Sequence, residues 1–314
     1  MRKNRYIYFI LVFIIIFPCV VKSQSITLIP KWTAQAQFAG YYVADKKGFY
    51  KEAGLDVQIK HTAVSESSFS ILRKGEAQAA VMNLSFALTT PEADLQIVNI
   101  MQTSQENSLM LVSRHPIKDI ESLRHEEIAV WSHLSEELLE RIASYYKLDG
   151  KWIRFNGGVN LFLSGAVDIC LVGSYNEYLQ LAECGLKSDS YYTCHFSDYG
   201  YDLPEDGLYV TRNFYNEHPD AVRKLVQASI RGWKWANEHP KETLDIVMEL
   251  VRENNIGTNR YHQDKMLREI LRLQVDKSCN QRTYRLSREA FEYASGILLN
   301  DREKRTLSYT DFVK

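Results

Sequence analysis

The sequence lacks the short motifs that mark several common classes of protein. It has no CxxC pair and no close spacing of histidine and cysteine, which excludes the usual structural zinc sites. It has no GxSxG elbow and no GxxxxGKS or GxxxxGKT loop, so neither a hydrolase of that type nor a P-loop protein is indicated. The eight histidines are scattered, and none stands four residues from another. We therefore expect no metal and no cofactor.

The sequence also lacks any block of basic residues, and its formal net charge is −1. Nucleic acid is therefore not an expected partner. The hydrophobic content of 45% and the charged content of 25% are ordinary for a soluble globular protein. A length of 314 residues allows two domains or one large one.

The N-terminus has the order of a secretory signal. Basic residues precede an apolar run over residues 6–17, and Pro18 and a short polar stretch follow. We expect residues 1–23 to be a signal peptide that is cleaved near Ser23, which makes the protein periplasmic. Two alternatives stay open. The run could be a membrane anchor, although it is shorter than the roughly 20 residues of a spanning helix, and Cys19 could be lipidated, although Pro18 fits such a site poorly.

Four cysteines remain in the mature chain. Cys170 lies in the apolar run "VDICLV" and reads as a buried thiol, whereas Cys184 and Cys194 are close enough in sequence to form a disulfide in an exported protein.

Strand-like and helix-like patterns alternate twice along the chain. Residues 26–30 and 55–62 read as strands with helical spacing between them, and the same alternation recurs after residue 116. After residue 207 the chain becomes nearly all helical. This order predicts an α/β fold of two lobes, each with a mostly parallel sheet. Lobe 1 would comprise residues 24–112 and 209–314, with the C-terminal helices packing back on it, and lobe 2 residues 113–208.

Two strands would connect the lobes, 108–114 going out and 207–212 coming back. A cleft between lobes is a common place for a small-molecule site. In such sheets, ligands bind beyond the carboxyl ends of the strands. Polar and aromatic residues at those ends are the candidate ligand-binding residues: Trp32, Gln37, Tyr41, Asn83, Ser85, Gly157, Gly158, Tyr175, Asn176, Glu177 and Tyr199.

Each candidate also has a purely structural interpretation. Tyr41 could pack inside the lobe, Asn83 and Ser85 could cap a helix, and the glycine pair could form a turn. The candidates gain weight because they converge on one side of the predicted sheets.

Several of these stretches resemble a known family. "WTAQAQFAGYYVADKKGFYKEAGLDVQI" is similar to the opening signature of the NMT1/THI5-like periplasmic substrate-binding proteins. "GEAQAAVMN", "NGGVNLFLSGAVDICLVGSYNEYLQL" and the segment from "SDYGYDL" onward follow in the family's order, so the resemblance covers residues 26–314. It implies a type II periplasmic-binding-protein fold, with two α/β lobes joined by two crossing strands. It also implies delivery of ligand to the permease subunits of an ABC importer.

One branch of the resembling family is an enzyme that makes the thiamine pyrimidine from pyridoxal phosphate and its own histidine. Met82 and Phe86 stand here where that branch has its lysine and histidine, and its cysteine-rich motif is absent. We therefore expect a binding protein and no enzyme.

The family binds thiamine pyrimidine precursors and, more distantly, alkanesulfonates. A carboxylate such as Glu177 would repel a sulfonate but accept hydrogen bonds from the exocyclic amine of an aminopyrimidine. We expect Trp32, Tyr41 and Tyr199 to stack on a flat ring. Polar contacts would come from Gln37, Asn83, Ser85 and Glu177, and the glycine pair would let the backbone approach.

The expected function is a monomeric periplasmic receptor for a pyrimidine of the formylaminopyrimidine or hydroxymethylpyrimidine type, which closes its lobes on the ligand. The alternatives are a sensing module for a separate signalling receptor, a binder of alkanesulfonate-type anions, and a hydrolase-like or synthase enzyme.

Overall fold

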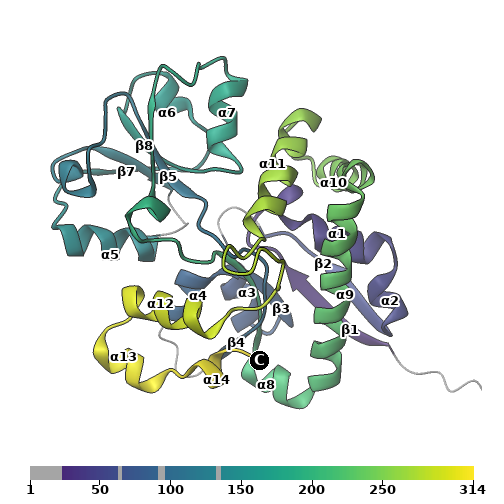
Figure 1. Ribbon diagram of the computed structural model, residues 1–314. Helices are drawn as coiled ribbons and strands as arrows, with labels where there is room; N and C mark the ends of the chain where they lie inside the picture. The colour runs from purple at the N-terminus through teal and green to yellow at the C-terminus, as the bar shows by residue number, and fades with distance from the viewer. Residues whose placement is uncertain (1–22, 63–65, 91–95, 132–135) are drawn as a thin grey trace, which may run out of the picture.

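The computed structural model describes residues 23–62, 66–90, 96–131 and 136–314 (Figure 1). The predicted signal peptide, apart from Ser23, and the possible lipid site at Cys19 lie outside these residues. Within the described residues, no helix is both long enough and apolar enough to cross a membrane.

Two separate five-stranded sheets form the framework. The first has the order β2-β1-β3-β10-β4, with strands β1 (Gln24–Ile29), β2 (Leu55–Ile59), β3 (Ala79–Asn83), β4 (Ile97–Gln102) and β10 (Asp206–Thr211). The second has the order β7-β6-β8-β5-β9, with strands β5 (Leu109–Ser113), β6 (Ile128–Trp131), β7 (Trp152–Phe155), β8 (Ile169–Gly173) and β9 (Tyr192–His195). The second sheet and its helices form the upper left lobe in Figure 1.

Each sheet is mixed, whereas the alternation of strands and helices predicts mostly parallel sheets. β1 pairs in parallel with β2 and β3, but β10 runs antiparallel to both β3 and β4. In the second sheet, β5 runs antiparallel to β8 and β9. The inserted strand is in each case the one that arrives from the other lobe, so its direction is not set by a local strand–helix–strand unit.

The two crossings between the lobes are irregular segments, residues 103–108 going out and 200–205 coming back. The predicted crossing strands each belong to one sheet only. β5 lies in the second sheet, although the predicted boundary put residues up to 112 in lobe 1, and β10 begins in the first sheet at Asp206. Alternating hydrophobicity identifies a strand but not the sheet that it joins.

Helices cover the faces of both sheets. In the first lobe up to residue 90 they are η1 (Ala36–Phe38), α1 (Ala39–Lys46), α2 (Phe49–Glu52), α3 (Ser68–Arg73) and α4 (Leu84–Thr89). In the second lobe they are η2 (Ile120–Leu123), α5 (Glu136–Tyr146), α6 (Asn160–Leu163), α7 (Glu177–Glu183) and η3 (Phe196–Tyr199). After β10 follow α8 (Arg212–Glu217), α9 (Pro219–Glu238), α10 (Pro240–Glu253), α11 (Arg260–Leu273), α12 (Arg288–Leu298), α13 (Asp301–Thr306) and α14 (Tyr309–Phe312).

The C-terminal helices pack back on the first lobe and also reach the second. α9 lies along α1, α14 contacts β4, and α12 contacts both α4 and the second-lobe helix α5 (Figure 1). α11 packs against α10 and η1 and extends to α7 of the second lobe. The lobes are therefore connected by helix contacts on two sides of the crossings.

The core of the first lobe depends on one close helix approach. Trp233 of α9 is fully buried and lies over Gly40 of α1, where a Cβ added to the glycine would fall 2.1 Å from indole atom Cδ2. Only glycine leaves room for the indole at that point. This contact locks α1, and with it the loop that follows β1, onto the C-terminal helices.

The four cysteines in the described part of the chain are free thiols. Cys194 is buried on β9, and Cys184 is exposed at the end of α7, so the possible disulfide between them is not formed. Cys170 is buried, in agreement with its apolar sequence context.

Candidate functional site

A cavity lies where the two lobes face each other. Its lining residues come from the loop after β1 and η1, the end of β3, both crossings and the start of β5, the end of β6, β8 with the turn that follows it, and the start of α7. They are Lys31, Trp32, Gln35, Gln37, Asn83, Ser108, Leu109, Trp131, Leu171, Gly173, Tyr175, Asn176, Glu177 and Glu205. Most of these positions follow the carboxyl ends of strands, which is where α/β sheets place their ligands.

Two tryptophans from opposite lobes meet at this cavity. The rings of Trp32 and Trp131 have centroids 5.8 Å apart and planes at 89°, and Phe155 supports Trp131 from behind at 5.0 Å. An edge-to-face pair of this kind is favourable, and either face can also stack on a flat ring. The aromatic surface of the cavity is therefore shared between the lobes.

His61 holds the Trp32 loop in place. Its Nδ1 lies 2.7 Å from the carbonyl oxygen of Trp32, and its Nε2 lies 3.0 Å from the hydroxyl of Tyr42. Burial lowers the pKa of His61, so the neutral ring donates to Trp32 and accepts from Tyr42. The ring is half-buried and has this supporting role.

A chain of buried polar groups forms the floor of the first-lobe side. Lys31 Nζ lies 2.5 Å from Asp206 Oδ1 and donates to Asn83 Oδ1, also at 2.5 Å. Gln37 donates to the other carboxylate oxygen of Asp206 at 2.7 Å and accepts from Gln35 at 2.6 Å. Lys31, the cation among these polar groups, is therefore already paired with Asp206.

Glu177 is the buried carboxylate of the second-lobe side. It begins α7 and is only 4% exposed. Its Oε2 accepts from the backbone N–H of Gly173 at 2.9 Å, and its Oε1 accepts from Asn176 Nδ2 at 2.6 Å. Burial raises the pKa of Glu177 to about 7, although these hydrogen bonds oppose the rise. The carboxylate has spare lone pairs that could accept from a ligand N–H.

Glu205 is a second buried carboxylate, and it binds the two crossings together. It accepts from the backbone N–H of Ser108 at 3.1 Å and from the Ser108 hydroxyl at 2.8 Å. Burial raises the pKa of Glu205 to about 7, while the charge of Lys31 lowers it and that of Asp206 raises it. The two carboxyl groups facing the cavity therefore both change charge near neutral pH.

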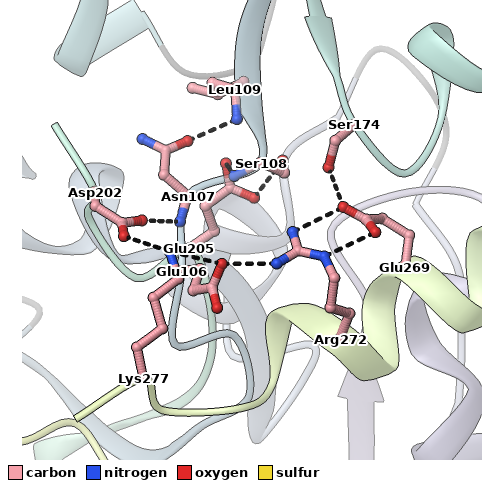
Figure 2. A network of polar contacts seen from close by, with 10 residues as sticks. All are labelled: Glu106, Asn107, Ser108, Leu109, Ser174, Asp202, Glu205, Glu269, Arg272 and Lys277. Carbon is pink, nitrogen blue, oxygen red and sulfur yellow. Dashed lines mark hydrogen bonds and ion pairs between the residues drawn. The ribbon is translucent and has the colours of Figure 1, made fainter. Parts of the chain in front are cut away.

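Charged side chains extend this link toward α11. Figure 2 shows Arg272 between Glu269 of its own helix and Glu106 of the outgoing crossing, with Glu269 bonded to Ser174 of the second lobe at 2.7 Å. Lys277 connects Glu106 with Asp202 of the returning crossing at 3.0 and 3.1 Å. The crossings are therefore tied to each other and to the C-terminal helices.

Six of the eleven predicted site residues line the cavity: Trp32, Gln37, Asn83, Tyr175, Asn176 and Glu177. Ser85 lines a smaller neighbouring pocket that shares Asn83, Leu109 and Glu205 with the cavity. Gly157 is not a lining residue, although a Cβ there would come 3.9 Å from Trp131, and Gly158 adopts the left-handed conformation at φ 72° beside Gln180 and Asn160. The glycine pair therefore forms the turn and does not line the cavity.

Two predicted stacking residues do not line it either. Tyr41 is 1% exposed; its hydroxyl lies 3.1 Å from Thr103 Oγ1 and its ring packs on Trp233. Tyr199 ends the short helix η3 and packs with residues of another core cluster. Tyr41 was predicted to stack on the ligand because it lies near a strand end. In the structure, α9 covers that face of α1.

Other cavity residues are missing from the sequence prediction. Trp131 ends the buried strand "IAVW", so the strand-end rule could have found it. Lys31 and Gln35 are neighbours of predicted residues in the same loop. Glu205 directly precedes β10, and the sequence gives no sign that it lines the cavity or that its neighbour Asp206 pairs with the distant Lys31.

The model of the NMT1/THI5-like family matches residues 35–243. The chain belongs to this family. It is similar to the riboflavin-binding protein RibY of Chloroflexus aurantiacus, with 23% identity over 74% of this chain and 68% of that protein. It is also similar to a formylaminopyrimidine-binding protein of Halalkalibacterium halodurans, with 22% identity over 72% of this chain and 70% of that one.

Among solved structures, the NMT1/THI5-like chain resembles a ligand-binding component of an ABC-type import system from Staphylococcus aureus. The TM-score is 0.63, with 12% identity over 93% of this chain and 96% of that one. The predicted periplasmic-binding-protein fold is confirmed. Both named relatives and this solved structure are binding proteins.

Proposed function

We propose that this NMT1/THI5-like protein is a periplasmic receptor that binds a flat, amine-bearing nitrogen heterocycle between Trp32 and Trp131 and delivers it to the permease of an ABC importer. A thiamine pyrimidine precursor of the formylaminopyrimidine or hydroxymethylpyrimidine type is the ligand that we favour. The observation that carries the proposal is the meeting of two indole rings from opposite lobes beside the buried Glu177 carboxylate.

The charge of the cavity favours an amine over an anion. Glu177 and Glu205 contribute two carboxyl groups, and Lys31, the cation among the lining residues, is already paired with the buried Asp206. A sulfonate or another anion would face these carboxylates without a free cation to offset the repulsion. A ring amine would instead find a hydrogen-bond acceptor in Glu177.

The similar proteins support the same class of ligand. The two relatives are named for riboflavin and for formylaminopyrimidine, and both molecules contain flat nitrogenous rings. We infer that the aromatic pair serves the ring and that the polar residues around it distinguish one ring from another.

The size of the cavity indicates how the ligand would enter. The space open to water inside it is about 40 Å³, which is enough for roughly three water molecules and too little for a pyrimidine. The lobes would therefore open to admit the ligand and close on it, with the edge-to-face indole pair giving way to rings that stack on the ligand. We further propose that the protein acts as a monomer after its signal peptide, residues 1–23, is removed.

A comparative thermal-shift titration tests this function. The purified protein would be titrated with hydroxymethylpyrimidine, formylaminopyrimidine, riboflavin and ethanesulfonate. A specific ligand at a hundred times its Kd should stabilise the fold by about 2.7 kcal/mol. Stabilisation by either pyrimidine supports the proposal. A response to riboflavin alone would keep the flat heterocycle and reject the pyrimidine, and a response to ethanesulfonate alone would contradict the role of Glu177.

A further inference from the structure

A histidine outside the predicted site joins the two lobes next to the cavity. His262 lies in the first turn of α11 and is 5% exposed. Its Nδ1 lies 2.9 Å from Glu183 Oε1, and its Nε2 lies 3.0 Å from Asn176 Oδ1, both in the second lobe. α11 is anchored in the core of the first lobe through Met266, Leu267 and other apolar residues. The ring therefore bridges one lobe to the other, and Figure 1 shows α11 close to α7.

The hydrogen bonds around Asn176 fix which atom His262 faces. Asn176 Nδ2 donates to the Glu177 carboxylate, so the amide oxygen must point the other way. That oxygen accepts from Gln180 Nε2 at 3.1 Å and faces His262 Nε2. The other imidazole nitrogen faces a carboxylate oxygen of Glu183. Both ring nitrogens thus face acceptors, and only the imidazolium form can donate to both.

The same amide connects His262 to the ligand-binding carboxylate. Asn176 and Glu177 both line the cavity, whereas His262 does not. A donor at His262 Nε2 holds the amide oxygen, which keeps the amide nitrogen directed at Glu177. Loss of that donor would free the amide to rotate and would leave Glu177 with only its bonds to backbone N–H groups.

We propose that His262 is a positioning residue for the binding cavity: it ties α11 to Asn176 and Glu183 when the lobes are closed, and it thereby sets the Glu177 carboxylate. The proposal deepens the function proposed above and rests on it for the effect on ligand. A second contact on the same helix, Glu269 with Ser174, lies two turns further along and reaches the same lobe (Figure 2).

Other charged groups near His262 are already engaged. From α7 it meets Glu183 directly and Glu177 through Asn176. On α10, Asp245 pairs with Arg260, and on its own helix Asp264 pairs with Arg268 and Glu269 with Arg272. The contacts of His262 with Glu183 and Asn176 are therefore not shared with these pairs. Closure should weaken when the ring is removed.

The first test measures affinity for hydroxymethylpyrimidine by calorimetry in the wild type, His262→Gln, Glu177→Gln, the double variant of these two, and His125→Gln. His125 is a matched control, because it also pairs with a carboxylate, Asp149, but within the second lobe and at an exposed site. Loss of one charge-assisted bond should weaken binding by His262→Gln roughly tenfold. The loss should be smaller when Glu177 is already glutamine, because His262 acts through that carboxylate, and His125→Gln should match the wild type. A His262→Gln variant that binds as tightly as the wild type would overturn the proposal.

The second test needs no ligand. Hydrogen–deuterium exchange of the α7 amides, residues 177–183, should be faster in ligand-free His262→Gln at pH 6 than in the wild type at the same pH. Glu183→Gln should show the same change, and the two changes should not add in the double variant, since they remove one contact. Unchanged exchange would overturn the role of His262. The variants could also exchange faster while the wild type binds none of the tested heterocycles. That result would support the interlobe contact of His262 but reject the proposed function.

Discussion

The indole rings of Trp32 and Trp131 meet edge to face at 5.8 Å across the boundary between the lobes. Trp32 follows β1 of the first sheet, and Trp131 ends β6 of the second, so the two rings move apart whenever the lobes do. The pair therefore lines the proposed binding cavity, and the two rings touch only while the lobes are together. A flat ring placed between two indole faces would replace one aromatic contact with two.

Removal of one indole should abolish much of the affinity. We expect Trp131→Ala to weaken binding of hydroxymethylpyrimidine by roughly tenfold or more, because aromatic anchors in closed sites carry much of the binding energy. Trp235→Ala is the matched control, since Trp235 lies on α9 beside His239 and Lys47, away from the cavity. Calorimetric titration of both variants measures the difference. Equal losses in the two variants would exclude the indole pair from binding.

The buried carboxyl groups should make stability depend on pH. Burial raises the pKa of Glu177 from its ordinary 4.5 to about 7, so between these values the folded protein holds a proton that the unfolded chain releases. This contribution is fully present below pH 4.5 and is lost as the pH rises through 7. It is on the order of 3 kcal/mol.

The free energy of unfolding, measured by urea denaturation, should therefore fall less in Glu177→Gln than in the wild type when the pH rises from 5 to 8. Glu205 also has a pKa of about 7, so the single variant keeps part of the dependence. The double variant with Glu205→Gln should lose most of the remainder. A wild-type protein as stable at pH 8 as at pH 5 would contradict the raised pKa values of both groups.

The sequence predicts the local part of the site better than its long-range part. Trp32, Asn83 and Glu177 follow strand ends, and strand ends can be recognised from short patterns. Tyr41 follows the same strand end, but its surroundings are decided by Trp233, which lies nearly 200 residues further along. No local pattern distinguishes a tyrosine that faces a ligand from one that faces a distant helix.

The electrostatic part of the site was missed for the same reason. Lys31 meets Asp206, and His262 meets Asn176 and Glu183, across long sequence separations. The two-lobe order was predictable because alternating strands and helices repeat along the chain. The partners of the crossing strands were not, since pairing between β5 and β8 or between β10 and β3 depends on where the lobes place each strand.

The charged link at the crossings should contribute to stability. Glu106 has an 8% exposed side chain and contacts both Arg272 and Lys277. We expect Arg272→Met to destabilise the protein by about 1–2 kcal/mol, because it leaves a buried carboxylate with one partner fewer. Arg268→Met is the control on the same helix. Its pair with Asp264 is exposed, so its cost should stay within about 0.5 kcal/mol. Urea denaturation distinguishes them, and equal costs would show that the crossings do not depend on Arg272.

Gly40 should tolerate no larger residue. A Cβ at this position would overlap the Trp233 indole, which is fully buried and cannot turn aside without disturbing α9. We expect Gly40→Ala to cost about 3 kcal/mol or more, at the upper end of the range for an overpacked core. Gly296→Ala is the opposite case. Gly296 lies inside α12 with nothing within 4 Å of a Cβ, so alanine should stabilise the helix by about 0.5–1 kcal/mol. Thermal unfolding should therefore move in opposite directions in the two variants, and a tolerated Gly40→Ala would mean that α1 and α9 can separate. Since α1 carries the loop with Trp32, the same variant should also weaken ligand binding even where the fold survives.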